Sequence, residues 1–226
     1  MRFGILGTGV VGKTIAARLA GLGHEVMVGT RNPEETLSRT GPDAYGNPPF
    51  SAWMEEHPEV MLGTFDEAAA HGEVVVNATA GVVSLEALEQ AGESNLGGKV
   101  LIDVANPLDF SKGMPPTLSV SNTDSLGEQI QRRFPEAKVV KTLHTMNAYL
   151  MVDPAQLAAT DHTVFVCGDD AEAKAAVTDL LRSFGWTDII DVGDITAARG
   201  TEMLLPIWVR LFGVLQKPIF NFKIVR

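Results

Sequence analysis

Short apolar segments alternate with longer amphipathic ones along most of the chain. Apolar runs bounded by Gly, Pro or charged residues are typical of buried strands. Apolar residues that recur at every third or fourth position predict helices. The expected strands cover residues 2–6, 25–29, 60–63, 73–79, 99–105, 138–145, 163–167 and 188–192. The clearest helical patterns cover residues 10–23, 123–134, 170–184 and about 195–216.

The regular alternation of strands and helices predicts the fold. Successive strand–helix–strand units are right-handed and place their strands side by side in a parallel sheet. The sequence therefore predicts an α/β protein with a Rossmann-type doubly wound parallel sheet and a small C-terminal α/β extension. We expect one domain at residues 1–150 and a smaller one at residues 151–226. Two segments rich in Gly and Pro, residues 41–50 and 106–122, are predicted to be loops.

Composition and charge narrow the classes of protein to which the chain can belong. Its 226 residues are 45% hydrophobic and 20% charged, enough apolar material for a sizeable core. The net charge of −10 argues against general binding to nucleic acid or to an anionic membrane, although a local basic pocket remains compatible with it. The single Cys167 lies in an apolar strand and is interpreted as a buried structural thiol in a reducing compartment.

No targeting segment is expected from the sequence. The first strand follows Met1 directly, without the pattern of a signal peptide. The most apolar stretch, residues 203–220, is interrupted by Pro206, Arg210 and Lys217, and its unbroken part is too short to span a bilayer, which takes about 20 residues. We therefore expect a soluble, cytoplasmic protein that does not bind membranes.

The segment GILGTGVVGKT at residues 4–14 satisfies two phosphate-binding patterns at once. Gly7, Gly9 and Gly12 after a strand form the dinucleotide-binding fingerprint, whereas Gly12 followed by Lys13 and Thr14 completes the loop of P-loop enzymes. A P-loop enzyme also needs an acidic residue after a strand to hold magnesium, and Asp103 is in such a place. The glycine pattern alone therefore leaves both interpretations open.

The residues after the second predicted strand favour the dinucleotide interpretation. In that fold the adenosine ribose is bound about 20 residues after the glycines, and an NAD site has an acidic residue there. This chain has Thr30, Arg31 and Asn32 instead. A hydroxyl and a guanidinium suit the doubly charged 2′-phosphate of NADP, and the P-loop interpretation gives no reason for them. The sequence thus predicts an NADP(H) site.

Three segments resemble the coenzyme F420-dependent NADP oxidoreductases. They are GILGTGVVGKTIAARLAGLGHEVMVGTRN at residues 4–32, LHT at residues 143–145 and VCGDDAEAK at residues 166–174, the last followed by a helical segment. The resemblance implies a Rossmann domain with a small C-terminal domain, frequent dimerisation, and hydride transfer between NADP(H) and coenzyme F420, a deazaflavin. The cytosolic domains of six-transmembrane ferric reductases are similar in the same places and pass electrons from NADPH to a flavin.

The resemblance also implies roles for individual residues. Thr8, Val10 and Val11 would face the pyrophosphate, and residues 78–80 would line the ribose and nicotinamide. His144, Met146 and Asn147 would form the floor on which the deazaflavin and nicotinamide stack. Asn106 and Pro107, which open the second long loop, are candidates for the nicotinamide end. The expected cofactor-binding set is Gly7, Thr8, Gly9, Val10, Val11, Gly12, Thr30, Arg31, Asn32, Ala78, Thr79, Ala80, Asn106, Pro107, Met146 and Asn147.

The expected chemistry needs little acid–base catalysis. Hydride transfer between two stacked rings depends mainly on positioning, and the sequence shows no clear acid–base pair, so His144 is the single catalytic candidate. The five histidines lack metal-ligand spacing, and no metal is expected. Trp208, Phe212 and Phe220 are more typical of a core or a dimer interface than of a flavin site.

The acceptor remains open at this stage. Archaeal members of the family carry a Pro and an aromatic residue where this chain has Thr79-Ala80-Gly81, and an apolar residue and Pro where it has Met146-Asn147. The alternatives are a flavin, or through it a metal ion or quinone, as the acceptor, and a non-catalytic NADP sensor. The expected partners are therefore a small redox acceptor and a second copy of the chain in a homodimer, without nucleic acid.

Overall fold

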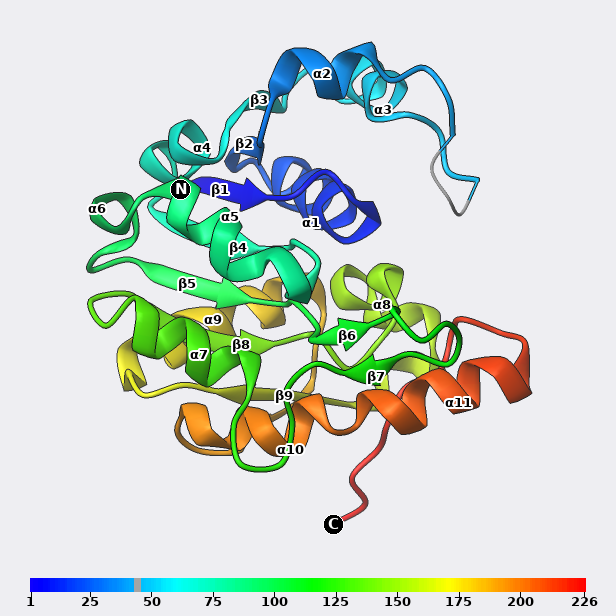
Figure 1. The fold of residues 1–226 in the computed structure, drawn as a ribbon. Coiled ribbons are helices and arrows are strands. Elements are labelled where there is room, and N and C mark those ends of the chain that lie inside the picture. The colour runs from blue at the N-terminus through cyan, green and yellow to red at the C-terminus, as the bar shows by residue number, and fades with distance from the viewer. Residues whose placement is uncertain (43–45) are drawn as a thin grey trace.

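An eight-stranded sheet forms the centre of the computed structural model, which describes residues 1–42 and 46–226 (Figure 1). The strands lie in the order β10-β9-β8-β5-β4-β1-β2-β3. Their bounds are β1 Arg2–Leu6, β2 Glu25–Thr30, β3 Met61–Thr64, β4 Val74–Asn77, β5 Val100–Asp103, β8 Lys138–Thr142, β9 Thr163–Cys167 and β10 Asp188–Asp191. Six neighbouring strands, β3-β2-β1-β4-β5-β8, are parallel and have the order of a dinucleotide-binding Rossmann sheet. The predicted fold class is therefore confirmed.

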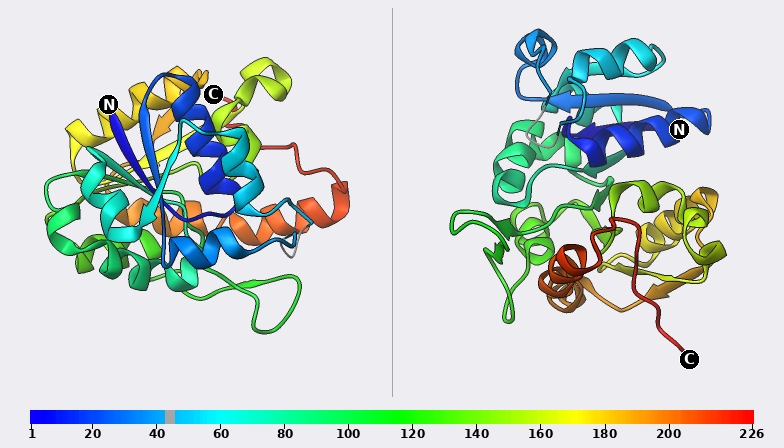
Figure 2. Two further views of the ribbon diagram at one scale, coloured as in Figure 1. Left: turned by 90° about the horizontal axis from the view of Figure 1, so that it is seen from above. Right: turned by 90° about the vertical axis from the view of Figure 1, so that its right-hand side faces the viewer.

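Helices cover both faces of the sheet (Figure 2). One core contains residues of α1, α8 and α9, and the other contains residues of α4, α5, α6 and α7. The α-helices are α1 Val10–Gly21, α2 Pro33–Ser38, α3 Phe50–Glu56, α4 Phe65–His71, α5 Ser84–Ala91, α6 Glu93–Leu96, α7 Leu126–Arg133, α8 Ala148–Val152, α9 Ala171–Phe184, α10 Ala198–Glu202 and α11 Leu205–Leu215. Single-turn 3₁₀ helices are η1 Gly81–Val83, η2 Pro154–Gln156, η3 Ala158–Thr160 and η4 Ile195–Ala197. In β4, Val74 and Val76 enter the first core and Val75 the second, which explains its unbroken run of Val.

The C-terminal extension adds two strands to the same sheet. β9 pairs with β8 in the antiparallel direction, and β10 then runs parallel to β9. The sequence predicted where these strands lie but not their direction. A parallel continuation after β8 needs a crossover that returns to the starting edge, and residues 143–162 contain only α8 and two single-turn helices. The sheet is continuous across residue 150. The division into two domains at this residue stays a prediction.

Two predicted segments differ from the structure. The expected helix at about 195–216 is divided into η4, α10 and α11, with α11 beginning at Leu205. Pro206 lacks a backbone N–H and is tolerated in a first helical turn, so a new helix begins there. The predicted loop at residues 106–122 contains the short strand pair β6 Leu108–Asp109 and β7 Thr117–Leu118, and it projects from the body (Figure 2). Part of the other predicted loop, residues 43–45, lies outside the described residues.

A buried ion cluster connects the centre of the sheet to the C-terminal helices. Lys141 in β8 is fully buried, and its Nζ lies 2.8 Å from Asp103 Oδ2 and 3.0 Å from Glu202 Oε1. The same ammonium donates to the carbonyl of Ala105 at 2.6 Å. Burial opposes the charge, but Asp103 and then Glu202 raise the pKa of Lys141 above its usual value. Lys141 therefore stays charged and ties β5, β8 and α10 together.

Glu202 also holds the start of α7. Its two carboxylate oxygens accept hydrogen bonds from the backbone N–H groups of Leu126 and Gly127, at 2.9 and 3.0 Å. These donors lack partners within the helix, so the carboxylate satisfies them, and the N–H groups and the helix dipole in turn stabilise its buried negative charge. Cys167 is also buried, and burial raises the pKa of its thiol to about 12, which confirms the structural interpretation of this residue.

We expect Lys141→Met to destabilise the fold by about 3–5 kcal/mol, because it leaves two buried carboxylates without their cation. Lys138→Met is the matched control in the same strand, since Lys138 forms a half-exposed pair with Asp170 at 3.2 Å. This change should cost less than about 1 kcal/mol. Urea unfolding followed by circular dichroism measures both, and equal losses would contradict the role given to Lys141.

Candidate functional site

A cleft opens where β1, β2 and β4 end. It lies at the carboxyl edge of the parallel strands, next to the reversal of strand order between β1 and β4. Open α/β sheets bind ligands at this place. The residues that line the cleft are Gly7, Thr8, Gly9, Thr30, Arg31, Asn32, Glu35, Thr36, Arg39, Phe65, Ala78, Thr79, Ala80, Val83, Glu86, Ala87 and Gln90.

The three glycines of the fingerprint have different physical roles. Gly7 has φ of +119°, and a Cβ there would lie 2.6 Å from the carbonyl oxygen of Ala78. A Cβ at Gly12 would overlap the carbonyl of Gly7. Gly9 has φ of −73°, and a Cβ there would meet no atom within 4 Å. The fold itself therefore requires Gly7 and Gly12, whereas Gly9 leaves the mouth of the cleft open to a ligand.

The start of α1 is suited to an anion. Gly9 precedes the helix, no side chain caps its first amide groups, and its first turn holds no acidic residue. Free backbone N–H groups and the helix dipole favour a phosphate at such an end. Together with the open side of Gly9, this arrangement fits the pyrophosphate of a dinucleotide.

Thr30, Arg31 and Asn32 lie together at the end of β2, as the sequence predicted. The Thr30 and Thr36 hydroxyls are 3.0 Å apart, and the Asn32 side chain accepts a hydrogen bond from the N–H of Glu35 at the start of α2. Arg31 is exposed and forms no hydrogen bond or ion pair with any residue that the structure describes. This corner therefore offers an available guanidinium to an anionic group.

The segment after β4, residues 78–80, is held in place by side-chain hydrogen bonds. Thr79 Oγ1 donates to Asn77 Oδ1 at 2.7 Å and lies 2.8 Å from Ser84 Oγ. Asn77 Nδ2 in turn donates to Asp103 Oδ1 at 2.9 Å. Residues 78–80 are thus positioned by a chain of hydrogen bonds that ends at the buried ion cluster of Asp103, Lys141 and Glu202.

The residues predicted for the acceptor end do not line this cleft. Asn106 Nδ2 donates to the carbonyl of His144 at 3.0 Å, and Asn147 caps α8 by accepting from the N–H of Tyr149. Met146 is 6% exposed and Pro107 is also buried. A Cβ on Gly81 would overlap the Asn106 carbonyl. The backbone of Asn106 therefore lies directly beside the segment that follows residues 78–80.

His144 is buried and uncharged. Its side chain is 1% exposed, and neither ring nitrogen has a hydrogen-bond partner among the described residues. Burial, and then the charge of Lys141, lower its pKa well below the usual value. An imidazole in this state does not add positive charge beside the cleft at neutral pH.

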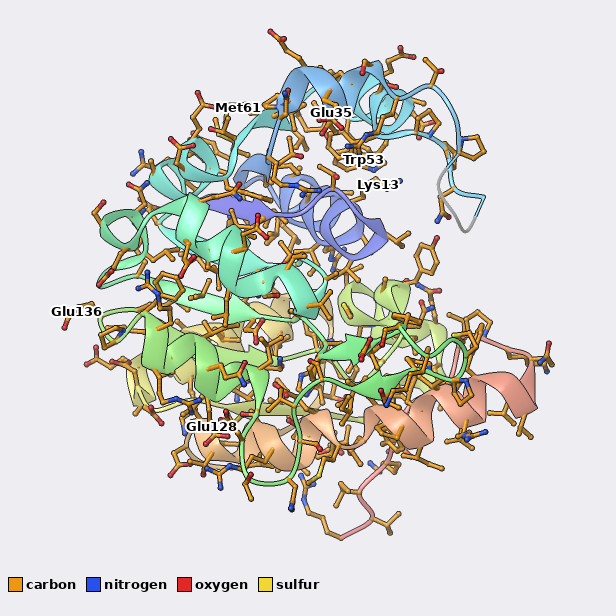
Figure 3. The ribbon with its side chains drawn as sticks, in the orientation of Figure 1. Lys13, Glu35, Trp53, Met61, Glu128 and Glu136 are labelled. Atoms are coloured by element: carbon orange, nitrogen blue, oxygen red, sulfur yellow. The ribbon has the colours of Figure 1, made fainter. Side chains whose placement is uncertain are left out.

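Three further residues of the predicted set point elsewhere. Val11 packs against the core, and Gly12 is buried against Gly7. Val10 lines a second cleft, formed between α1, α3 and α8, which also contains Lys13 and Trp53 (Figure 3).

The structure separates the groups that a P-loop enzyme needs together. Lys13 faces the second cleft, with its Nζ 3.5 Å from the carbonyl of Pro48, whereas Asp103 is fully buried against Lys141. Within residues 1–42 and 46–226, no three His, Cys, Asp or Glu side chains gather as a metal site requires. In the same part of the chain, no helix is both long and apolar enough to cross a membrane.

Sequence reasoning missed the part of the cleft formed by α2. Glu35, Thr36 and Arg39 line it, and none of them was in the expected cofactor-binding set. The signal was present in the sequence, because Asn followed by Pro33 is typical of a helix start, and Glu35 and Arg39 have the spacing of a helical ion pair. Glu86 and Gln90 of α5 were missed as well.

Known proteins resemble the chain in sequence and in fold. The family described as NADP oxidoreductase, coenzyme F420-dependent, matches residues 2–107. A crystal structure from Arthrobacter sp. FB24, described provisionally as an F420-dependent NADP reductase, has a TM-score of 0.95 and 62% identity over 100% of this chain and 99% of that chain.

Two curated relatives differ in how much of their own length they share with the chain. The F420-dependent NADP reductase of Methanocaldococcus jannaschii is 27% identical over 93% of this chain and 92% of the relative. The metalloreductase STEAP3 of Rattus norvegicus is 29% identical over 92% of this chain, which spans only 38% of that relative. The family match, the full-length likeness at 62% identity and the glycine turn agree. The chain belongs to the family of coenzyme F420-dependent NADP oxidoreductases.

Proposed function

We propose that the chain transfers a hydride between NADPH and a deazaflavin of the coenzyme F420 type. Its family makes it an NADP-dependent oxidoreductase, so the proposal concerns the acceptor and the residues that bind each substrate. The observation that carries the cofactor half is Arg31, an exposed guanidinium that forms no hydrogen bond or ion pair with a described residue, in the cleft where a 2′-phosphate would lie.

Each part of the cleft suits one part of NADP(H). The turn at residues 7–12 and the start of α1 would bind the pyrophosphate, with Thr8 beside it. Arg31, with Thr30 and Asn32, would bind the 2′-phosphate. Residues 78–80, held by the Asn77 hydrogen bonds, would line the ribose and nicotinamide.

The acceptor would lie beyond residues 78–80, on the group formed by Asn106, Pro107, His144, Met146 and Asn147. When bound, NADPH supplies the hydride. The protein contributes by holding two flat rings in contact and by excluding water, an effect that can supply about 7–11 kcal/mol. The uncharged, buried His144 fits an apolar floor, and the hydride-transfer step requires no proton from its imidazole.

Relatives support two acceptors to different extents. The full-length relatives carry the name F420-dependent NADP reductase, which favours a deazaflavin. The likeness to metalloreductase STEAP3 favours a second candidate, in which NADPH reduces a flavin and through it a metal ion. The shared region covers a minor part of that relative, so we give this candidate second place.

A homodimer in the cytoplasm is part of the proposal. Ile207, Phe212, Val214 and Leu215 of α11 are each more than 40% exposed, and Trp208 stacks on Phe212 and Phe220 at ring-centre distances of 5.8 and 5.0 Å. A second copy of the chain would cover this apolar face. The buried Cys167 fits a reducing compartment.

We expect Gly9→Ala and Gly12→Ala to separate binding from folding. A methyl group at Gly9 enters the open mouth of the cleft, so the variant should fold with a loss below about 1 kcal/mol but bind NADPH and NADH equally poorly. Gly12→Ala forces a methyl group against the Gly7 carbonyl and should destabilise the fold by about 1–3 kcal/mol. Thermal unfolding and titration of NADPH fluorescence measure the two effects. Unchanged NADPH binding in Gly9→Ala would show that the cleft is not the dinucleotide site.

Arg31→Ala should weaken NADPH binding by about 1.5–3 kcal/mol, the size of a charge-assisted hydrogen bond, and leave NADH nearly unchanged. Lys13→Ala is the control, since Lys13 faces the second cleft, and it should leave NADPH binding unchanged. Calorimetric titration of each cofactor gives both affinities. Equal losses of NADPH and NADH in Arg31→Ala would overturn the assignment of the 2′-phosphate corner.

Rapid mixing of the NADPH complex with candidate acceptors should identify the second substrate. We expect fast oxidation of NADPH by coenzyme F420 and slow oxidation by FMN, FAD or ferric citrate. Absorbance at the NADPH and F420 bands follows the reaction. Fast flavin reduction without F420 turnover would favour the metalloreductase candidate, and tight NADPH binding without any reduction would favour a sensor.

A further inference from the structure

Glu35 and Arg39 form an ion pair on the wall of the cofactor cleft. Arg39 Nη2 lies 2.7 Å from Glu35 Oε1, and the side chains are 59% and 62% exposed. Both residues line the cleft together with Arg31, and Glu35 lies on α2, the helix that follows β2 (Figure 3). A carboxylate thus occupies the region in which the proposed site needs positive charge.

The two arginines of this part of the cleft differ in their ion pairing with Glu35. The hydrogen bond and charge of Arg39, with a smaller contribution from Arg31, hold the pKa of Glu35 below its usual value, so Glu35 is ionised at neutral pH. Its negative charge neutralises one of two guanidiniums in the cleft. Arg39 is therefore paired with Glu35, whereas Arg31 forms no hydrogen bond or ion pair with any described residue.

We propose that Glu35 is an internal counter-ion that competes with the 2′-phosphate of NADP(H) for Arg39, which makes Arg39 a second phosphate-binding residue. The proposal rests on the NADP(H) site described above and adds a device that tunes its selectivity. In the free protein Arg39 pairs with Glu35, and in the complex it turns to the ligand.

The exchange is favourable for physical reasons. An exposed carboxylate–guanidinium pair one helical turn apart contributes little to stability, because water and salt screen it. A phosphate monoester carries nearly two negative charges and three acceptor oxygens, and a guanidinium can bind it through two N–H groups. NAD(H) lacks this group and leaves the pair intact, so Glu35 affects only the phosphorylated cofactor.

Glu34 provides a matched control for the test. It precedes Glu35 in the same first turn of α2, it is exposed, and it has no partner among the described residues and no place in the cleft lining. Glu34→Gln and Glu35→Gln change the net charge and the helix terminus alike. A difference between them that disappears when Arg39 is also replaced reports on the local pairing with Arg39.

Calorimetric titration of the full chain with NADP⁺, NAD⁺ and 2′,5′-ADP tests the proposal. Glu35→Gln should tighten NADP⁺ and 2′,5′-ADP by about twofold to fivefold, and this gain should shrink as salt is raised. NAD⁺ affinity should not change, and Glu34→Gln should have no effect on any ligand. Arg39→Gln should weaken NADP⁺ and 2′,5′-ADP by about tenfold, and in Glu35→Gln/Arg39→Gln the gain should disappear.

The outcomes separate this proposal from the proposed function. Equal effects of Glu34→Gln and Glu35→Gln would reduce Glu35 to a long-range charge and overturn the inference. Unchanged NADP⁺ affinity in Arg39→Gln, with a selective loss in Arg31→Ala, would overturn it and leave the NADP(H) site standing. If neither Arg31→Ala nor Arg39→Gln reduces the selectivity for NADP⁺ over NAD⁺, the assignment of the 2′-phosphate site itself is refuted. Circular dichroism of each variant shows that the exposed changes leave the fold intact.

Discussion

A fully buried lysine holds together the part of the sheet on which the two substrates are proposed to meet. Lys141 joins Asp103 of β5 to Glu202 of α10, and Glu202 binds the start of α7. Charges taken out of water are tolerated only when each one is paired and hydrogen-bonded. The ends of β5, β8 and the C-terminal helices therefore have one arrangement that satisfies all three groups. Through Asn77, the same arrangement positions the segment that follows β4.

Much of the fold follows from local patterns in the sequence. β1 and β9 have the predicted bounds, and the run of Val in β4 indicated a strand with a core on each side. Two short segments of the candidate cleft, residues 7–9 and 30–32, were equally accessible to prediction, because each is contiguous in the chain, whereas the lining from α2 and α5 was not in the expected set. Where neighbours in the chain are also neighbours in the site, spacing alone is sufficient to predict it.

The remaining features depend on contacts that sequence spacing does not encode. Lys141 reads as one polar residue in an apolar strand, and its partner Asp103 lies 38 residues earlier. The antiparallel direction of β9 depends on the path of residues 143–162, which have no clear periodic pattern. Asp103 illustrates the difficulty best, since its place after a strand suggested a magnesium ligand until the structure showed it fully buried against a lysine.

The two ends of the proposed site therefore differ in how they are specified. The cofactor end would use the backbone geometry at Gly7 and Gly9 and the charge of Arg31, which suit features that every NADP(H) molecule has. The acceptor end would use Asn106 and His144, which are held by hydrogen bonds and packing among distant segments. Shape rather than charge would select the acceptor there, so modest changes in packing could change it while the cofactor end stays the same. This difference would give a physical reason why relatives named for F420 and for metal reduction are both similar in sequence to this chain.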